Sequence, residues 1–159
     1  MPSSRIVSEQ VIRKVVDTPG EHAWVSDRGT LTIRWPVPSV LLYVETGHLH
    51  AGFAPHIVEA YETTTRRGVR PHVFVDCERL VNYDPEVRRQ PTAWIQHNRQ
   101  RIVAQHMLVR SRFTRMGLQL VSMFLGGVIV GHNERRTFEQ AMREAVVASS
   151  ASETSVVSL

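Results

Sequence analysis

The chain is almost without cysteine and lysine. Cys77 is its only cysteine, which excludes an internal disulfide. With no signal-peptide pattern at the N-terminus, we expect a protein kept in the reducing cytoplasm. All but one of the 19 basic residues are arginine, and Lys14 is the exception. We interpret this bias as a property of the genome rather than of a functional site.

Long apolar runs and long basic runs are also lacking. The most apolar stretch, residues 117–131, is shorter than the roughly 20 residues that a membrane-spanning helix needs, and Gly126 and Gly127 interrupt it. The net charge is +4, but no run of five or six basic residues and no nucleic-acid motif accompanies it. We therefore expect neither a membrane nor a nucleic acid as the partner.

What is present is ordinary globular composition. The chain has 159 residues, of which 42% are hydrophobic and 21% charged, and this is enough for one domain with a core. We divide it into an N-terminal segment 1–20, where four apolar residues could line a short helix, an α/β domain 21–148, and a tail 149–159. The tail is rich in serine and has no packing pattern, so we expect it to be disordered.

Strand and helix patterns alternate along the domain. Residues rich in valine, isoleucine and aromatic side chains form runs that predict strands, and apolar residues at helical spacing follow most of them. The expected order is ββαβαβαβα, which is typical of an α/β fold with a mostly parallel, four- to five-stranded sheet and right-handed crossover helices. In the third crossover helix we expect Phe113 and Phe124 to be buried against the sheet.

The segment from Pro71 to Val87 organises this prediction. A short buried strand around Phe74 is expected to end at Asp76, and a loop then leads to a helix that starts near Asp84. We expect Asp84 to cap that helix, because its side chain can accept hydrogen bonds from the first free N–H groups. Ligands and partners of open α/β sheets usually meet the protein at the carboxyl ends of the strands, so this loop is a candidate site.

Seven residues at or just beyond predicted strand ends form the candidate partner-binding surface. They carry charged, hydroxyl or aromatic groups, and each could instead be a helix cap or a solvated surface residue. They are Asp76, Tyr83, Asp84, Arg110, Ser111, Arg112 and His132.

Two kinds of chemistry are weighed and set aside. His48, His50 and His56 lie close in sequence, but no carboxylate or cysteine stands at metal-ligand spacing from them. Cys77 beside Asp76 could in principle act as a nucleophile, although a cysteine that ends an apolar strand is usually buried. We therefore predict no metal, no cofactor and no catalysis.

Three segments resemble the STAS domain family, in its SpoIIAA-like branch of anti-sigma-factor antagonists. They are the strand-to-helix segment 73–84, the segment His106-Met-Leu-Val-Arg-Ser-Arg112, and the closing segment 126–133 with Phe138-Glu-Gln-Ala141. The resemblance covers about residues 29–147. It implies a small α/β domain that works without catalysis as a protein-interaction switch, in some members with a nucleotide or other small ligand.

One position departs from the antagonists of that family. They carry Asp-Ser at the start of this helix and are switched by phosphorylation of the serine, whereas here Asp84 matches and Pro85 replaces the serine. The resemblance therefore implies a module that lacks the usual phosphorylation site.

The sequence thus predicts a non-enzymatic, cytoplasmic regulatory module that binds another protein through the loops around Tyr83-Asp84 and Ser111-Arg112. The alternative is a small-ligand or nucleotide binder that uses the same edge, and an enzyme based on Cys77 is third. Whether the chain forms a homodimer is left open.

Overall fold

The structure is a computed structural model that describes residues 11–110 and 126–156. Its strands and helices follow one another along the chain in an order that begins with four strands. They are β1 (Arg13–Thr18), β2 (Glu21–Val25), β3 (Gly29–Val37), β4 (Val40–Leu49), the 3-10 turn η1 (Ala51–Phe53), α1 (Ala54–Arg66), β5 (His72–Tyr83), α2 (Glu86–Asn98), the 3-10 turn η2 (Arg99–Arg101), β6 (Ala104–Leu108), β7 (Ile129–His132) and α4 (Arg135–Val156).

Within the described residues the strands form one seven-stranded sheet, in the order β1-β2-β3-β4-β5-β6-β7. The pairs from β1 to β4 are antiparallel, and the pairs from β4 to β7 are parallel. The predicted α/β class is confirmed, but the expectation of a mostly parallel, four- to five-stranded sheet is wrong. The difference arises because short turns join the first four strands, and only antiparallel neighbours can be joined that way.

The largest single error lies in the N-terminal segment. Residues 13–18 were expected to include part of a short helix, but they form β1, which pairs with β2 across the two-residue turn Pro19-Gly20. Two adjacent β-branched residues, Val15 and Val16, favour an extended chain over a helix. The weak apolar spacing that suggested a helix is outweighed by this local preference and by the partner strand.

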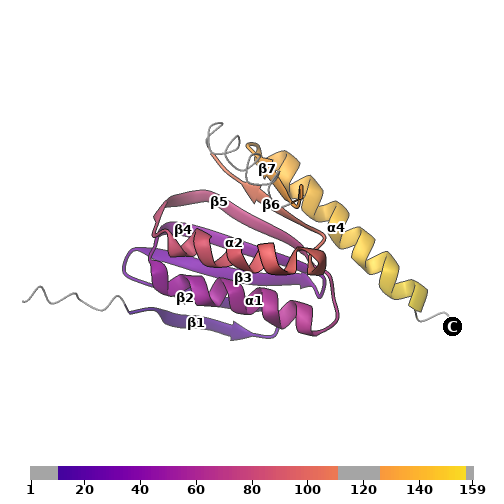
Figure 1. The fold of residues 1–159 in the computed structure, drawn as a ribbon, viewed down its shortest axis with the longest axis horizontal. Coiled ribbons are helices and arrows are strands. Elements are labelled where there is room, and N and C mark those ends of the chain that lie inside the picture. The colour runs from indigo at the N-terminus through magenta and orange to yellow at the C-terminus, as the bar shows by residue number, and fades with distance from the viewer. Residues whose placement is uncertain (1–10, 111–125, 157–159) are drawn as a thin grey trace, which may run out of the picture.

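The helices cover the two faces of the sheet separately. Side chains alternate along β5, so Val73 and Val75 pack in the core under α1 and α2, while Phe74 packs with Phe138 of α4. Figure 1 shows α1 and α2 lying side by side across the sheet, with α4 apart from them beside β6 and β7. The protein therefore has a large core under α1 and α2, here called the α1/α2 face, and a smaller one under α4, the α4 face.

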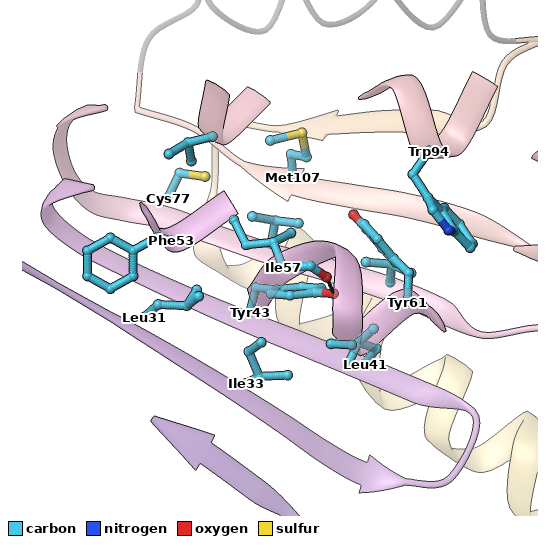
Figure 2. Close-up of a cluster of buried hydrophobic side chains, with 14 of the residues drawn as sticks. Leu31, Ile33, Leu41, Tyr43, Phe53, Ile57, Tyr61, Cys77, Trp94 and Met107 are labelled. Atoms are coloured by element: carbon cyan, nitrogen blue, oxygen red, sulfur yellow. Dashed lines mark hydrogen bonds between the residues drawn. The ribbon is translucent and has the colours of Figure 1, made fainter. Parts of the chain in front are cut away.

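Tyrosine side chains cross the α1/α2 core and satisfy their hydroxyl groups inside it. The Tyr43 hydroxyl donates to the Ile57 carbonyl of α1 at 2.8 Å, as Figure 2 shows, and the Tyr61 hydroxyl donates to Oε1 of Gln105 at 2.6 Å. Trp94 of α2 stacks on Tyr61 with the ring centroids 4.8 Å apart. Because buried hydroxyls are costly unless paired, these bonds fix how α1 sits on the sheet, and the stacking of Trp94 holds α2 beside it.

β5 is much longer than predicted. It was expected to end at Asp76 and Cys77, but it continues to Tyr83 as a partner of β4. Its pairing with β6 stops at Asp76, so the second half of β5 has no described strand on its β6 side. This overhang, residues 77–83, carries the end of β5 past the end of β6.

The expected disorder of residues 149–159 is contradicted for residues 149–156, because α4 continues to Val156. The hydroxyls of Ser149, Ser150 and Ser152 donate to the carbonyls four residues earlier, at 2.8, 3.0 and 3.1 Å. These bonds satisfy the hydroxyl groups within the helix, which lets a serine-rich segment remain helical.

Two expectations concern positions elsewhere in the chain. Phe113 and Phe124, expected to be buried in the third crossover helix, lie outside the described residues. In the part that the structure describes, no helix combines the length and the apolar character that crossing a membrane requires.

Candidate binding site at the carboxyl edge of the sheet

A cavity of about 480 Å³ lies on the α1/α2 face. Its apolar wall comes from the sheet and both helices, and it includes Ile57, Val75, Ile95, Met107, Val109 and Ile129. Figure 2 shows Ile57, Cys77 and Met107 around the same region of the core. The volume is within the range of small-molecule pockets, and the mixture of apolar walls with a few polar groups is typical of them.

A buried ion pair forms the polar part of this cavity. Glu45 of β4 is 1% exposed and accepts two hydrogen bonds from the guanidinium of Arg88, Nη1 to Oε1 at 3.1 Å and Nη2 to Oε2 at 2.7 Å. Burial disfavours the charged guanidinium, but the combined effect of Glu45, Cys77 and Tyr83 is larger and raises the pKa of Arg88. This bidentate geometry is the arrangement in which a buried pair recovers the most of its desolvation cost.

Cys77 belongs to the same cluster. Its thiol donates to Oε2 of Glu45 at 3.5 Å and accepts from Nη2 of Arg88 at 3.4 Å. Burial, followed by the negative charge of Glu45, raises the pKa of the Cys77 thiol well above its ordinary value. Since the thiolate is the nucleophile, this environment suits a structural thiol.

Tyr83 connects the cluster to the surface. Its ring lies over the guanidinium of Arg88, 4.6 Å from the ring centroid, and the residue is 41% exposed. Glu45 fixes the position of the Arg88 guanidinium in the core. The cation–π contact with this guanidinium then holds the ring of Tyr83 at the surface. Val81, two residues earlier on the overhang, is 84% exposed and is the most exposed large apolar residue in the described chain.

Asp84 has a different role from the one predicted. It does not cap α2, whose N-cap residue is Pro85 and has no side-chain cap hydrogen bond. Instead its carboxylate accepts from the Ala51 N–H at 2.9 Å and lies 3.2 Å from Nε2 of His48. The prediction failed because the competing donor, the Ala51 N–H, belongs to η1, 33 residues away in sequence.

Asp76 and His132 lie on the α4 face, away from the cavity. Asp76 accepts from Nη2 of Arg135 at 2.8 Å, and Arg135 also forms an ion pair with Glu78. His132 stacks beside His106, with Nε2 of His132 2.9 Å from Nδ1 of His106. These contacts anchor the start of α4 on the sheet.

The seven candidate residues therefore do not form one cluster. Tyr83 and Arg110 both line the cavity, Asp84 joins β5 to η1, and Asp76 and His132 lie under α4. Ser111 and Arg112 lie outside the described residues, so their place in the surface stays a prediction.

Sequence reasoning missed Glu45 and Arg88, although both left a signal. Along β4, Glu45 occupies the same alternating position as Leu41 and Tyr43, which predicts that it faces the core. Along α2, Arg88 precedes Ile95 by seven residues, which places it on the buried stripe. Two opposite charges on inward-facing positions are the pattern of a buried pair.

Metal binding finds no support in the described residues, where no group of three or more histidine, cysteine or acidic side chains is close enough to hold an ion. Of the three histidines weighed as ligands, His48 contacts Asp84, His50 accepts from the Gly52 N–H, and His56 stacks on Trp24.

Comparisons with known proteins match the fold and not the sequence. No family model and no curated protein matches the chain. Among solved structures, the anti-sigma factor antagonist SpoIIAA in its unphosphorylated form matches with a TM-score of 0.56 and 14% identity, over 72% of this chain and 96% of that one. The Bacillus cell fate determinant SpoIIAA in the phosphorylated form matches with a TM-score of 0.53 and 14% identity, over 70% and 98%.

An uncharacterised protein from Shewanella loihica also matches. It belongs to the DUF3478 family, has a SpoIIAA-like fold, and is 9% identical with a TM-score of 0.52, over 83% of this chain and 93% of that one. The resemblance to SpoIIAA-like proteins is thus confirmed for the fold. At these identities the comparison carries the fold alone.

Proposed function

We propose that this chain is a cytoplasmic regulatory module of the STAS type, which acts by binding another protein and not by catalysis. The fold supports the regulatory part, because two of the solved structures that share it are forms of an anti-sigma factor antagonist. The partner-binding surface is the overhang of β5 with the start of α2. Ser111 and Arg112, which follow Arg110 in the chain, are proposed to extend it.

The observation that carries this proposal is the pair of exposed apolar side chains on the overhang. Val81 and Tyr83 are 84% and 41% exposed, and Tyr83 is held in place by Arg88. A rigid, exposed aromatic ring beside an arginine is a combination that often dominates the energy of protein interfaces. The overhang also leaves one strand edge without a described partner, and such edges favour pairing with another chain.

Regulation differs from that of a module switched by phosphorylation at the helix start. Pro85 has no hydroxyl group and cannot accept a phosphate. The proposed module is therefore controlled by the availability of its partner or by a ligand, and not by a phosphoserine at this position.

The absence of catalysis is part of the proposal. Cys77 is the only cysteine, and its buried thiol has a raised pKa, so the reactive thiolate is disfavoured. A small-ligand binder is the second candidate function, and the cavity with its buried ion pair favours it.

A partner-capture experiment tests the first candidate. The immobilised full chain should retain a specific partner, and Val81→Asp should abolish retention, because a charge at the centre of an apolar contact is not compensated. Val147→Asp is the matched control, since Val147 is also exposed, at 69%, but lies on α4. Both variants should keep the melting temperature of the parent. Equal capture by the Val81→Asp variant would place the interface elsewhere.

A further inference from the structure

The charges that line the cavity do not balance. Its charged lining residues are Glu45, Arg88 and Arg110. Glu45 and Arg88 neutralise each other through two hydrogen bonds. Arg110 is exposed, and within residues 11–110 and 126–156 no carboxylate forms an ion pair with it. The cavity therefore carries one uncompensated positive charge.

The rest of the lining combines apolar side chains with uncharged polar ones, and of the latter Tyr43, Tyr61 and Gln105 already have hydrogen-bond partners in the core. Val75, Met107 and Ile129 from three adjacent parallel strands line it together with Ile95 of α2, and Val109, just beyond the end of β6, precedes Arg110 in the chain. A ligand that fills this space gains from burying an apolar body, while its charged end gains from contact with a guanidinium. The charged end is expected at Arg110, because among the described lining residues Arg110 is the one whose charge has no ion-pair partner.

Glu45 decides how many charges the ligand carries. It is 1% exposed, and its two carboxylate oxygens are already held by Arg88. A second anionic group deep in the cavity would meet this carboxylate in surroundings of low polarity, where repulsion between like charges is strong. The cavity thus favours a single anionic group at the Arg110 end over one at each end.

From these observations we infer that the cavity binds an apolar monocarboxylate, with its carboxylate at Arg110 and its aliphatic body over Val109, Met107 and Ile95. This inference rests on the second candidate function and names its ligand class. The cavity adjoins the partner surface, since Val81 and Tyr83 also line it, but Arg110 and Thr92 are not among the residues that carry the partner proposal, so variants at these two positions test the ligand inference separately.

Three eight-carbon probes that carry one, no or two negative charges test the roles assigned to Arg110 and Glu45. Calorimetric titration of the full chain with octanoate should give saturable binding. We expect 1-octanol, which lacks the charge, and octanedioate, which adds a second one, each to bind at least about tenfold more weakly, a difference equivalent to about 1.4 kcal/mol. Equal affinity for octanol would remove the role of Arg110, and equal or tighter binding of octanedioate would remove the role of Glu45.

Variants locate the bound probe. Arg110→Gln should weaken octanoate about tenfold and leave octanol unchanged, whereas Arg101→Gln, at an exposed arginine of η2, should change neither. Thr92 lines the cavity and the adjacent Ala93 is exposed and does not line it, so Thr92→Trp should block octanoate while Ala93→Trp should not. Thermal unfolding checks that each variant is folded.

The outcomes separate this inference from the proposed partner binding. Absence of saturable octanoate binding to the parent chain, or equal effects of the two tryptophan variants, would overturn the ligand inference. Loss of capture by Val81→Asp would in that case still support the partner surface. If the parent chain binds octanoate but captures no partner, only the ligand inference is supported.

Discussion

On the α1/α2 face, the side chain of Glu45 is 1% exposed and that of Arg88 is 27% exposed, and the two bind each other and Cys77, with the ring of Tyr83 over the guanidinium. On the α4 face, Arg135 remains 41% exposed and is shared among Asp76, Glu78 and Glu139. The first arrangement is a single pair with no substitute partner. The second is a network in which Arg135, Glu78 and Glu139 keep contact with water, and of its members only Asp76 is buried.

This difference shows what each face contributes. Breaking a buried pair leaves an uncompensated charge in the core, so the Glu45–Arg88 pair specifies one position of α2 on the sheet. Exposed ion pairs are worth little individually, so Arg135 adds little to stability and mainly positions the start of α4. The α1/α2 face is therefore expected to be rigid around the cavity, and the α4 face to respond to solution conditions.

The largest expected effect comes from breaking the buried pair. Glu45→Ala should lower the free energy of unfolding by about 3–5 kcal/mol, because Arg88 keeps its charge without a partner. Arg135→Ala, the matched change on the α4 face, should cost about 1 kcal/mol or less. Urea unfolding measured by circular dichroism gives both values. The double variant Glu45→Leu with Arg88→Met should recover much of the loss, and similar costs for Glu45→Ala and Arg135→Ala would remove the contrast.

An intermediate effect is expected from pH on the α4 face. Burial, followed by repulsion from His132 and His72, lowers the pKa of His106 from 6.5 to about 4. On acidification, His106 of the unfolded chain binds a proton near pH 6.5, whereas His106 of the folded protein binds it only near pH 4. Stability from this site is therefore complete above pH 6.5 and declines as the pH falls from 6.5 to 4.

Melting temperatures across this pH range measure the decline. His106→Phe keeps a ring that can stack on Phe74, as His106 does at a centroid distance of 4.7 Å, but it cannot titrate. The variant should lose less stability on acidification than the parent. An unchanged acid dependence would show that other groups, such as His132, account for it.

The smallest effect is expected at Asp84, where the sequence suggested a helix cap. Asp84→Ala should cost about 1 kcal/mol, because it removes an acceptor from the exposed Ala51 N–H. Asp84→Asn keeps an acceptor oxygen and should lose less. If both variants melt like the parent, the contact with Ala51 contributes nothing measurable.

The sequence predicts those strands and helices whose type follows from the spacing of apolar residues along the chain. The alternating strand 40–45 and the helix with Ile57 and Tyr61 on one side were found because neighbouring residues determine both periodicities. The N-terminal strand was missed because the spacing of the apolar residues suggested a helix, and the preference of Val15 and Val16 for an extended chain is weak until β2 lies beside them. The length of β5 was missed for a similar reason, since its second half is a strand only through pairing with β4.

The candidate site was predictable in location but not in composition. Tyr83 and Arg110 were placed at the carboxyl edge, and both line the cavity there. Asp76 was expected at the same edge, but the side-chain alternation along β5 turns it toward Arg135 on the opposite face. A shift of one residue in the predicted end of the strand is enough to move a side chain from one face to the other.

By itself the sequence determined the alternation of strands and helices, the single thiol, and the proline at position 85, because each is a property of the residues themselves. Only the tertiary structure decided the partners of Asp84, Glu45 and Arg88. Glu45 and Arg88 are 43 residues apart, and they meet because the sheet and α2 bring them together where Glu45 is 1% exposed. The energy of such a pair depends on burial, which no local pattern of residues contains.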